Sequence, residues 1–205
     1  AWNLPLFNIG LAHGGGNFHL FRSREALMTR LVANENADYG ITEQDIVDRY
    51  AIYQGLALML TDPFPISYDS TQHIDMWMLP LADNTILVSE YPKADTVPHA
   101  ITEAIAVEMA TRGYDVFRTP GWNDFGTHYT YANSVIVNHV ALICRFGGNY
   151  DAQDAQALSV YQIALPDHDI VQVDCSGIIH LAGAIHCIVM HVPDLLFRDP
   201  FEDDL

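Results

Sequence analysis

Cys187 is a residue that could do covalent chemistry. It lies in the apolar run Ile178 to Pro193 (IIHLAGAIHCIVMHVP), which is interrupted at Gly183 and ends at a proline. This pattern predicts a buried strand with a turn of small residues at its mouth, where a thiol can face the floor of a pocket. The alternative is a core cysteine, because free cysteine is among the most buried residue types. Taken alone, the run favours the core.

His73 and Asp75 form a second candidate pair, in the sequence His73-Ile74-Asp75. Residues i and i+2 share a face of a strand, so on a strand the imidazole and the carboxylate would project into one pocket, whereas on a helix they would diverge. A carboxylate can hold a planar cation through paired hydrogen bonds, and an imidazole beside it can exchange protons near neutral pH. The alternative is a solvent-exposed histidine next to an aspartate in a turn.

The histidines near Cys187 are not expected to take part. His186 is adjacent to Cys187, so on a strand it faces the opposite side and should not be the base for the thiol. The spacing of His180, His186 and His191 fits neither HExxH nor a Cys/His zinc pattern. We therefore predict no metal site, and no cofactor is called for.

The elements that would position these residues repeat one plan of strand, strand, helix and strand. A helix from Thr42 has an acidic first turn, which is typical of a helix N-terminus, and Gly113 is a helix-ending glycine. The expected strands are 26–33 and 56–60 in the first stretch, 73–79, 85–89 and 114–118 in the second, and 133–138, 141–146 and 170–174 in the third; the further helices are 102–112 and 151–161.

The plan recurs about three and a half times, with Ile178 to Pro193 as the start of a fourth unit. Asn17, His73, Asn133 and Cys187 occupy equivalent points, separated by 56, 60 and 54 residues. A repeat of this length predicts units stacked around an axis, each too small to bury its face alone. All four marker residues would then point to one central site. Three and a half units would not be enough to close a ring around this axis.

The composition limits the partners. Half of the 205 residues are hydrophobic, which predicts a packed core, and no apolar run approaches the roughly 18–20 residues of a membrane span. The net charge of −17, with Lys93 as the only lysine, argues against nucleic acid and suits cationic small molecules or basic peptides. Three cysteines form no CxxC and leave at least one thiol free, while one disulfide stays open.

Four segments together resemble the guanidine-modifying (pentein) superfamily, nearest its agmatine deiminase and bacterial peptidylarginine deiminase branch. They are Gly15-Gly16-Asn17, His73-Ile74-Asp75-Met76-Trp77, Tyr131-Ala132-Asn133-Ser134 and Gly183-Ala184-Ile185-His186-Cys187. They occur in the family's order across nearly the whole chain. The resemblance implies an α/β fold of the pentein-type propeller of five units, of which this chain, as a single domain 1–205, would hold about three and a half.

The resemblance also implies roles. Cys187 would be the nucleophile, His73 the general acid and base, and Asp75 the carboxylate that binds the guanidinium group. Asn133, Asn17 and Trp77 would contribute to substrate binding. The implied activity is that of a cysteine-dependent deiminase, a hydrolase acting on C–N bonds of amidines, which releases ammonia from peptidyl-arginine or agmatine through a covalent thiouronium. An amidinotransferase and a non-catalytic arginine-binding member of the same fold are the alternatives.

One family feature is missing from its expected place. The family carries a second carboxylate in an N-terminal Arg-Asp motif, and the only Arg-Asp here is Arg198-Asp199, near the other end. The chain also starts at Ala1 rather than methionine. Two hypotheses follow: a precursor cut before Ala1, whose N-terminal piece remains as a second chain in a heteromer, or a truncated or divergent member without turnover. Processing of that kind would favour a secreted or extracytoplasmic protein. From the charge and the apolar runs, we expect neither a nucleic-acid nor a membrane partner.

Overall fold

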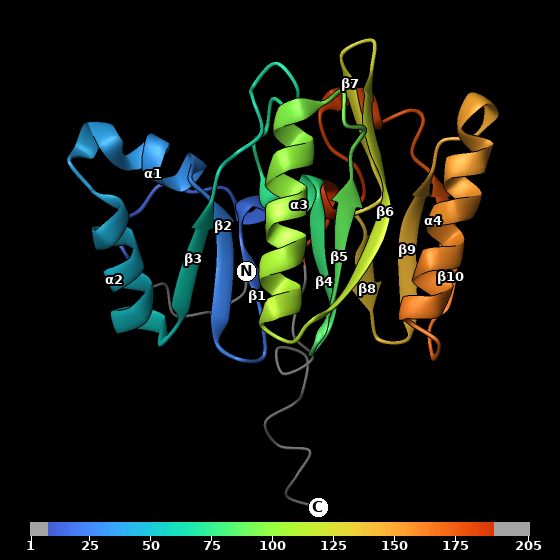
Figure 1. Cartoon of the computed structure of the whole chain (residues 1–205). Coiled ribbons are helices and arrows are strands. Elements are labelled where there is room, and N and C mark those ends of the chain that lie inside the picture. Colours follow the sequence, from blue (N-terminus) through green and yellow to red (C-terminus); the bar gives the residue numbers. More distant parts are fainter. Residues whose placement is uncertain (1–7, 191–205) are drawn as a thin grey trace, which may run out of the picture.

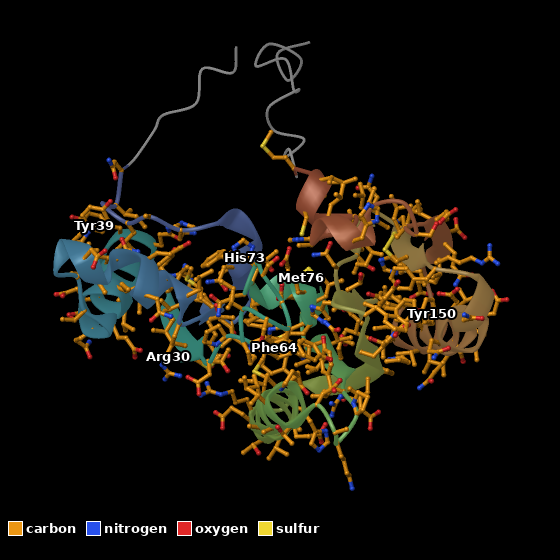
Figure 2. All side chains as sticks on the ribbon, turned by 90° about the horizontal axis from the view of Figure 1, so that it is seen from above. Arg30, Tyr39, Phe64, His73, Met76 and Tyr150 are labelled. Atoms are coloured by element: carbon orange, nitrogen blue, oxygen red, sulfur yellow. A yellow bond between two sulfur atoms is a disulfide. The ribbon has the colours of Figure 1, made fainter. Side chains whose placement is uncertain are left out.

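Three units of similar design make up the described part of the chain. The structure is a computed structural model that describes residues 8–190. Figure 1 shows the units side by side, each with its own sheet and its main helix on one face. Viewed from above in Figure 2, they form an arc with the helices on the outside. In this range, the helices are too short or too polar to cross a bilayer.

The first unit joins an antiparallel pair of strands to a parallel third strand through helices. Thr42 caps the longer helix: its side chain accepts from the backbone N–H of Asp45, and the Asp45 carboxylate accepts from the backbone N–H of Thr42. Gly55 ends that helix in the left-handed conformation, at φ 66°. The elements of this first unit are β1 His19–Leu20, β2 Glu25–Thr29, α1 Leu31–Asn36, α2 Glu43–Gln54 and β3 Ala57–Thr61. In the sheet, β2 lies between β1 and β3.

The second unit repeats the arrangement and adds a hairpin. Its sheet has the order β4-β5-β6-β7, and only the β5–β6 pair is parallel, because the helix α3 connects those two strands. Its elements are β4 Met78–Ala82, β5 Thr85–Glu90, α3 Thr96–Thr111, β6 Asp115–Asp124 and β7 Thr127–Thr130.

The third unit has the strand order β8-β9-β10. A disulfide between Cys144, near the end of β9, and Cys175, just after β10, joins the two parallel neighbours. Cys187 is the free cysteine. The elements of this third unit are β8 Val135–Val137, β9 Val140–Arg145, α4 Asp151–Ala164 and β10 Asp169–Asp174.

Each unit has its own apolar core between helix and sheet. Ile46 and Tyr50 of α2, Met109 of α3, and Ala157 and Tyr161 of α4 are buried against their sheets. Within residues 8–190, five short 3₁₀ helices lie among the connections: η1 Gly15–Asn17, η2 Ala37–Tyr39, η3 Ile74–Met76, η5 Ile179–Leu181 and η6 His186–Ile188; a sixth, η4 Gly148–Tyr150, leads into α4.

The structure confirms the repeated plan and corrects three of its parts. The first predicted strand ends at Thr29, and α1 follows it. The predicted strand 73–79 begins only at Met78, because His73 to Trp77 form a short helical turn. The run from Ile178 forms η5 and η6 rather than a strand as far as residue 190, so the predicted half unit is not a strand here. His191, Pro193 and Arg198-Asp199 lie outside the described residues.

Candidate active site

A cavity of about 600 Å³ opens where the three units meet. In Figure 2 the labelled His73 and Met76 lie near the middle of the arc, beside the turns that carry Cys187. The cavity is lined by the candidate histidine His73, by His186, by the candidate carboxylate and by the free thiol. Its lining residues are Gly15, Gly16, Phe18, Thr71, His73, Asp75, Ala182, His186, Cys187 and Val189.

Asp75 is the buried carboxylate of this cavity. Its Oδ2 accepts hydrogen bonds from His186 Nδ1 at 2.8 Å and from Asn133 Nδ2 at 3.0 Å. Its Oδ1 has no hydrogen-bond partner within residues 8–190. An unpartnered buried carboxylate oxygen is costly, so this atom would gain from a ligand that donates hydrogen bonds. A planar cation could do so with charge assistance.

The thiol of Cys187 lies against the same carboxylate. It accepts from Asn133 Nδ2 at 3.1 Å and lies 3.5 Å from Asp75 Oδ2. Burial of the thiol, and next the negative charge of Asp75, raise the pKa of Cys187 to about 11, although the Asn133 hydrogen bond acts in the opposite direction. The thiol is therefore protonated at pH 7 while the cavity holds no cation.

The glycine turn brings the backbone close to His73 and Asp75. A Cβ placed on Gly16 would lie 2.7 Å from Asp75 Oδ2 and 2.9 Å from His73 Nδ1, and one on Gly14 would lie 2.7 Å from two atoms of the His73 ring. Only glycine permits this approach without displacing a side chain. His73 precedes η3 in an extended conformation, and Asp75 lies within η3, yet both side chains meet over Gly16.

Asn133 holds the Cys187 turn in place from behind the cavity. Its side chain is buried, and its Oδ1 accepts from the backbone N–H groups of Ala184 at 3.0 Å and Cys187 at 3.4 Å. The same amide donates to Asp75 and to the thiol. Asn133 thus connects the third unit to the second through the reactive groups.

Asn17 and Trp77 do not line the cavity. Asn17 is buried, and its Oδ1 accepts from the backbone N–H groups of Thr29 at 2.9 Å and Ile74 at 3.3 Å, which joins the glycine turn to the His73 segment. Trp77 is fully buried and stacks on Phe64, with ring centroids 5.6 Å apart. The structure therefore brings together His73, Asp75, Asn133 and Cys187, and places Asn17 and Trp77 around them.

His186 is the cavity residue that sequence reasoning rejected. We expected it to face away from Cys187, because neighbours on a strand point to opposite sides. In η6, however, neighbours are about 120° apart, since a 3₁₀ helix has three residues per turn, so both can border one cavity. Its position next to Cys187 in the sequence was the feature that could have identified His186 as a cavity residue. His19 packs edge-on against His186, and burial lowers the pKa of His19 to about 4, so His19 is neutral at pH 7.

Metal ligation finds no support in this part of the chain. Within residues 8–190, no group of three or more His, Cys, Asp or Glu side chains is arranged to hold a metal ion. The reactive groups that line the cavity are the thiol of Cys187, the carboxylate of Asp75 and the imidazoles of His73 and His186.

Known proteins match this chain in both sequence and fold. A family model described as Porphyromonas-type peptidyl-arginine deiminase matches residues 2–193. A protein of Marinomonas sp. (strain MWYL1), provisionally named an agmatine deiminase, is 35% identical over 65 residues, which make up 32% of this chain and 17% of that protein.

Two solved structures show the same fold. Agmatine deiminase of C. jejuni, in a Cys-to-Ser form with substrate bound, has a TM-score of 0.72 and 20% identity, covering 84% of this chain and 54% of that one. A protein of Porphyromonas gingivalis, provisionally named an arginine deiminase, has a TM-score of 0.72 and 23% identity, covering 87% and 56%. The chain spans about half the length of these structures, and the likeness confirms the predicted fold class.

Proposed function

This chain belongs to the Porphyromonas-type peptidyl-arginine deiminase family of the pentein superfamily, and from that premise we propose that it hydrolyses a guanidinium group to a ureido group and ammonia. The observation that carries the proposal is the meeting of a free thiol, a carboxylate and two imidazoles in one cavity. The substrate would be peptidyl-arginine or agmatine, because both present a guanidinium group on a flexible alkyl chain.

Asp75 would bind the guanidinium group. Its Oδ2 is occupied by His186 and Asn133, while Oδ1 has no partner among the described residues. A guanidinium N–H could donate to Oδ1 without breaking either existing hydrogen bond. Asp75 would then hold the planar cation next to the thiol, which lies 3.5 Å from its other oxygen.

Binding of the cation would itself activate Cys187. In the cavity without a cation, burial and the Asp75 charge raise the pKa of the thiol to about 11. A guanidinium group next to the sulfur cancels the effect of Asp75 and adds a positive charge that favours the thiolate. The nucleophile would thus form when the substrate is in place.

The reaction would proceed in two halves. Thiolate attack forms an S–C bond to the guanidinium carbon, and a C–N bond breaks as His73 protonates the departing nitrogen, which leaves as ammonia. A water molecule that has lost its proton to His73 then attacks the thiouronium carbon. The C–S bond breaks, and the ureido product leaves with the thiolate restored. One water is consumed for each ammonia released.

Product analysis tests the proposal. The complete protein, including any further segment or second chain that accompanies this one, is incubated with an arginine-containing peptide and, separately, with agmatine; citrulline or carbamoylputrescine and ammonia are measured. We expect one ureido product for each ammonia, and no product from C187S or H73N. Absence of both products with Cys187 intact would contradict the proposal. Turnover that requires an added amine acceptor would indicate an amidinotransferase instead.

A thiol-directed haloacetamidine probe separates an enzyme from a binding module. Cys144 and Cys175 form a disulfide, so Cys187 is the thiol available within the described residues. An enzyme should react at Cys187 in a pH-dependent manner and lose that reaction in D75N, because the amidinium group of the probe needs the carboxylate. Binding of arginine peptides without labelling would favour the non-catalytic alternative.

We also propose that other parts of the protein complete the cavity. The chain spans about half the length of the solved relatives, and the family's second carboxylate has no counterpart in the expected motif of this sequence. A further segment or a second chain would supply it. Intact-mass and native-size measurements test this: a folded monomer of this chain alone that turns over substrate would overturn it.

A further inference from the structure

A second, smaller cavity lies next to the proposed active site. Its volume is about 130 Å³, well above the roughly 10–15 Å³ that one water molecule needs. Ala182 lines both cavities. The remaining lining residues come from the loop before His73, the β6–β7 hairpin and η5: Ile66, Ser67, Tyr68, Asp69, Ser70, Gly126, Thr127, His128, Ile179 and His180.

Two buried polar atoms in its lining have no partner within residues 8–190. They are Asp69 Oδ2 and His128 Nδ1, which lie 3.9 Å apart on side chains that are 1% and 4% exposed. Buried polar atoms normally find a hydrogen-bond partner. At 3.9 Å the two atoms do not bond each other, but one small molecule could contact both.

The surroundings favour a positively charged molecule. Burial lowers the pKa of His128 to about 3, so this imidazole is neutral at pH 7 and does not balance the carboxylate. Burial also raises the pKa of Asp69, and the nearby Asp75 charge acts in the same direction. A cation in the cavity would favour the ionised Asp69 carboxylate and so oppose both burial and the Asp75 charge, while the neutral His128 could still accept a hydrogen bond from it. Tyr68 adds an aromatic ring to the lining, and aromatic faces attract cations.

From these contacts we propose that the small cavity binds an ammonium ion between Asp69 Oδ2 and His128 Nδ1. Ammonium has the size of water, carries the required charge and donates to both atoms. It must meet a lone pair on Nδ1, so the His128 proton must be on Nε2, which lies 2.6 Å from the Tyr91 oxygen. The binding site does not depend on the proposed function; only the source of the ion does, because deimination releases ammonia in the neighbouring cavity.

A hydrogen-bonded segment connects the small cavity to the active site. Asp69 Oδ1 accepts from the backbone N–H and the hydroxyl of Thr71, at 3.0 and 2.7 Å. Thr71 in turn lines the larger cavity, and its hydroxyl accepts from the backbone N–H of His73 at 3.3 Å. Asp69, which would hold the ion, is therefore hydrogen-bonded to Thr71, a residue that lines the reaction cavity.

Thallium(I), an anomalous scatterer that replaces ammonium, can reveal the site without turnover. Crystals of C187S are soaked in thallium(I) acetate, alongside the same protein carrying D69N or D38N. D69N keeps an oxygen for Thr71 but replaces the acceptor in the cavity with a donor, and D38N removes an exposed charge elsewhere. We expect an anomalous peak between residues 69 and 128 in C187S and in the D38N protein, and none in the D69N protein.

Melting temperatures supply the solution measurement. Ammonium chloride should raise the melting temperature of C187S and of its D38N variant more than sodium or potassium chloride at equal ionic strength, because a ligand that binds only the folded state stabilises it. The D69N protein should show no such preference. An equal response to potassium, or a cavity without a thallium peak, would overturn the proposal. If D69N does not fold, the C187S peak and salt series decide. Ammonium binding to a protein without deiminase activity would refute the proposed function alone.

Discussion

His186 Nδ1 donates to Asp75 Oδ2 at 2.8 Å, although the two residues are 111 positions apart in the chain. This hydrogen bond joins the turn that carries Cys187 to the segment that carries His73. Asp75 Oδ1 keeps no hydrogen-bond partner within residues 8–190, and we infer that His186 positions Asp75 in the proposed reaction.

The role of His186 can be tested with a pair of substitutions. H186L removes the donor to a buried carboxylate, an interaction of about 1.5–3 kcal/mol, and should raise KM about 10- to 100-fold with a smaller change in kcat. H186N places an amide donor close to the position of Nδ1 and should keep most of the affinity. Steady-state kinetics on both variants supply the measurement. Equal losses in the two variants would show that the imidazole acts through its own proton chemistry.

Removing the Asp75 charge should lower the pKa of the Cys187 thiol. The pKa is raised to about 11 by burial first and by Asp75 second, so D75N should move the alkylation profile to lower pH while burial keeps it above the ordinary cysteine value. Iodoacetamide labelling followed by mass spectrometry from pH 6 to 11 measures this. Labelling of the unchanged protein should increase up to the highest pH. A D75N profile that coincides with it would contradict the assigned cause.

Gly16→Ala should disturb the site, whereas Gly15→Ala should not. A Cβ on Gly16 would lie 2.7 Å from Asp75 Oδ2 and 2.9 Å from His73 Nδ1, whereas a Cβ on Gly15 meets nothing within 4 Å. We expect at least a tenfold loss of kcat/KM for the Gly16 variant, which corresponds to about 1.4 kcal/mol, and near-normal activity for its neighbour. Circular dichroism controls for folding. Similar activity of the two variants would show that Asp75 and His73 can shift without cost.

The disulfide should stabilise the third unit. Cys144 and Cys175 are 31 residues apart and join the parallel strands β9 and β10. Replacing both by alanine should lower the free energy of unfolding by about 2–4 kcal/mol. Urea denaturation provides the measurement, and C187S serves as the control for loss of a thiol. An unchanged unfolding midpoint in the double variant would contradict the expected contribution.

Local patterns were sufficient for much of the fold. The helix after Thr42 carries its capping residues in sequence, and the apolar runs that became β3, β5 and β9 lie between turn-forming residues. Such elements depend on contacts between residues close in the chain, so the sequence alone predicted the repeated unit. The sequence also singled out His73, Asp75 and Cys187 as site candidates, and the structure brings these side chains to one cavity.

The run around Cys187 could not be read in that way. Its apolar residues suggested a strand, but a strand needs a neighbouring edge to bond with. Here the backbone N–H groups of Ile178, Leu181 and Ala182 bond three residues back instead, and that of His186 bonds to Asn133. The apolar Ile179, Ala184 and Ile185 are buried against the third unit. The same hydrophobicity thus serves a set of turns, and no local pattern distinguishes the two outcomes.

The sequence by itself predicted which residues could react: at least one free thiol, with Cys187 as the candidate, a His-x-Asp pair and an asparagine at repeat spacing. The structure showed that Cys144 and Cys175 form a disulfide, which leaves Cys187 as the free thiol. Only the tertiary structure decided which of them touch. Contacts between residues more than a hundred positions apart depend on how whole units pack. Packing placed His186 against Asp75 and buried Trp77 in the core. It also left Asp69 Oδ2 and His128 Nδ1 without partners within residues 8–190, on residues that line a second cavity.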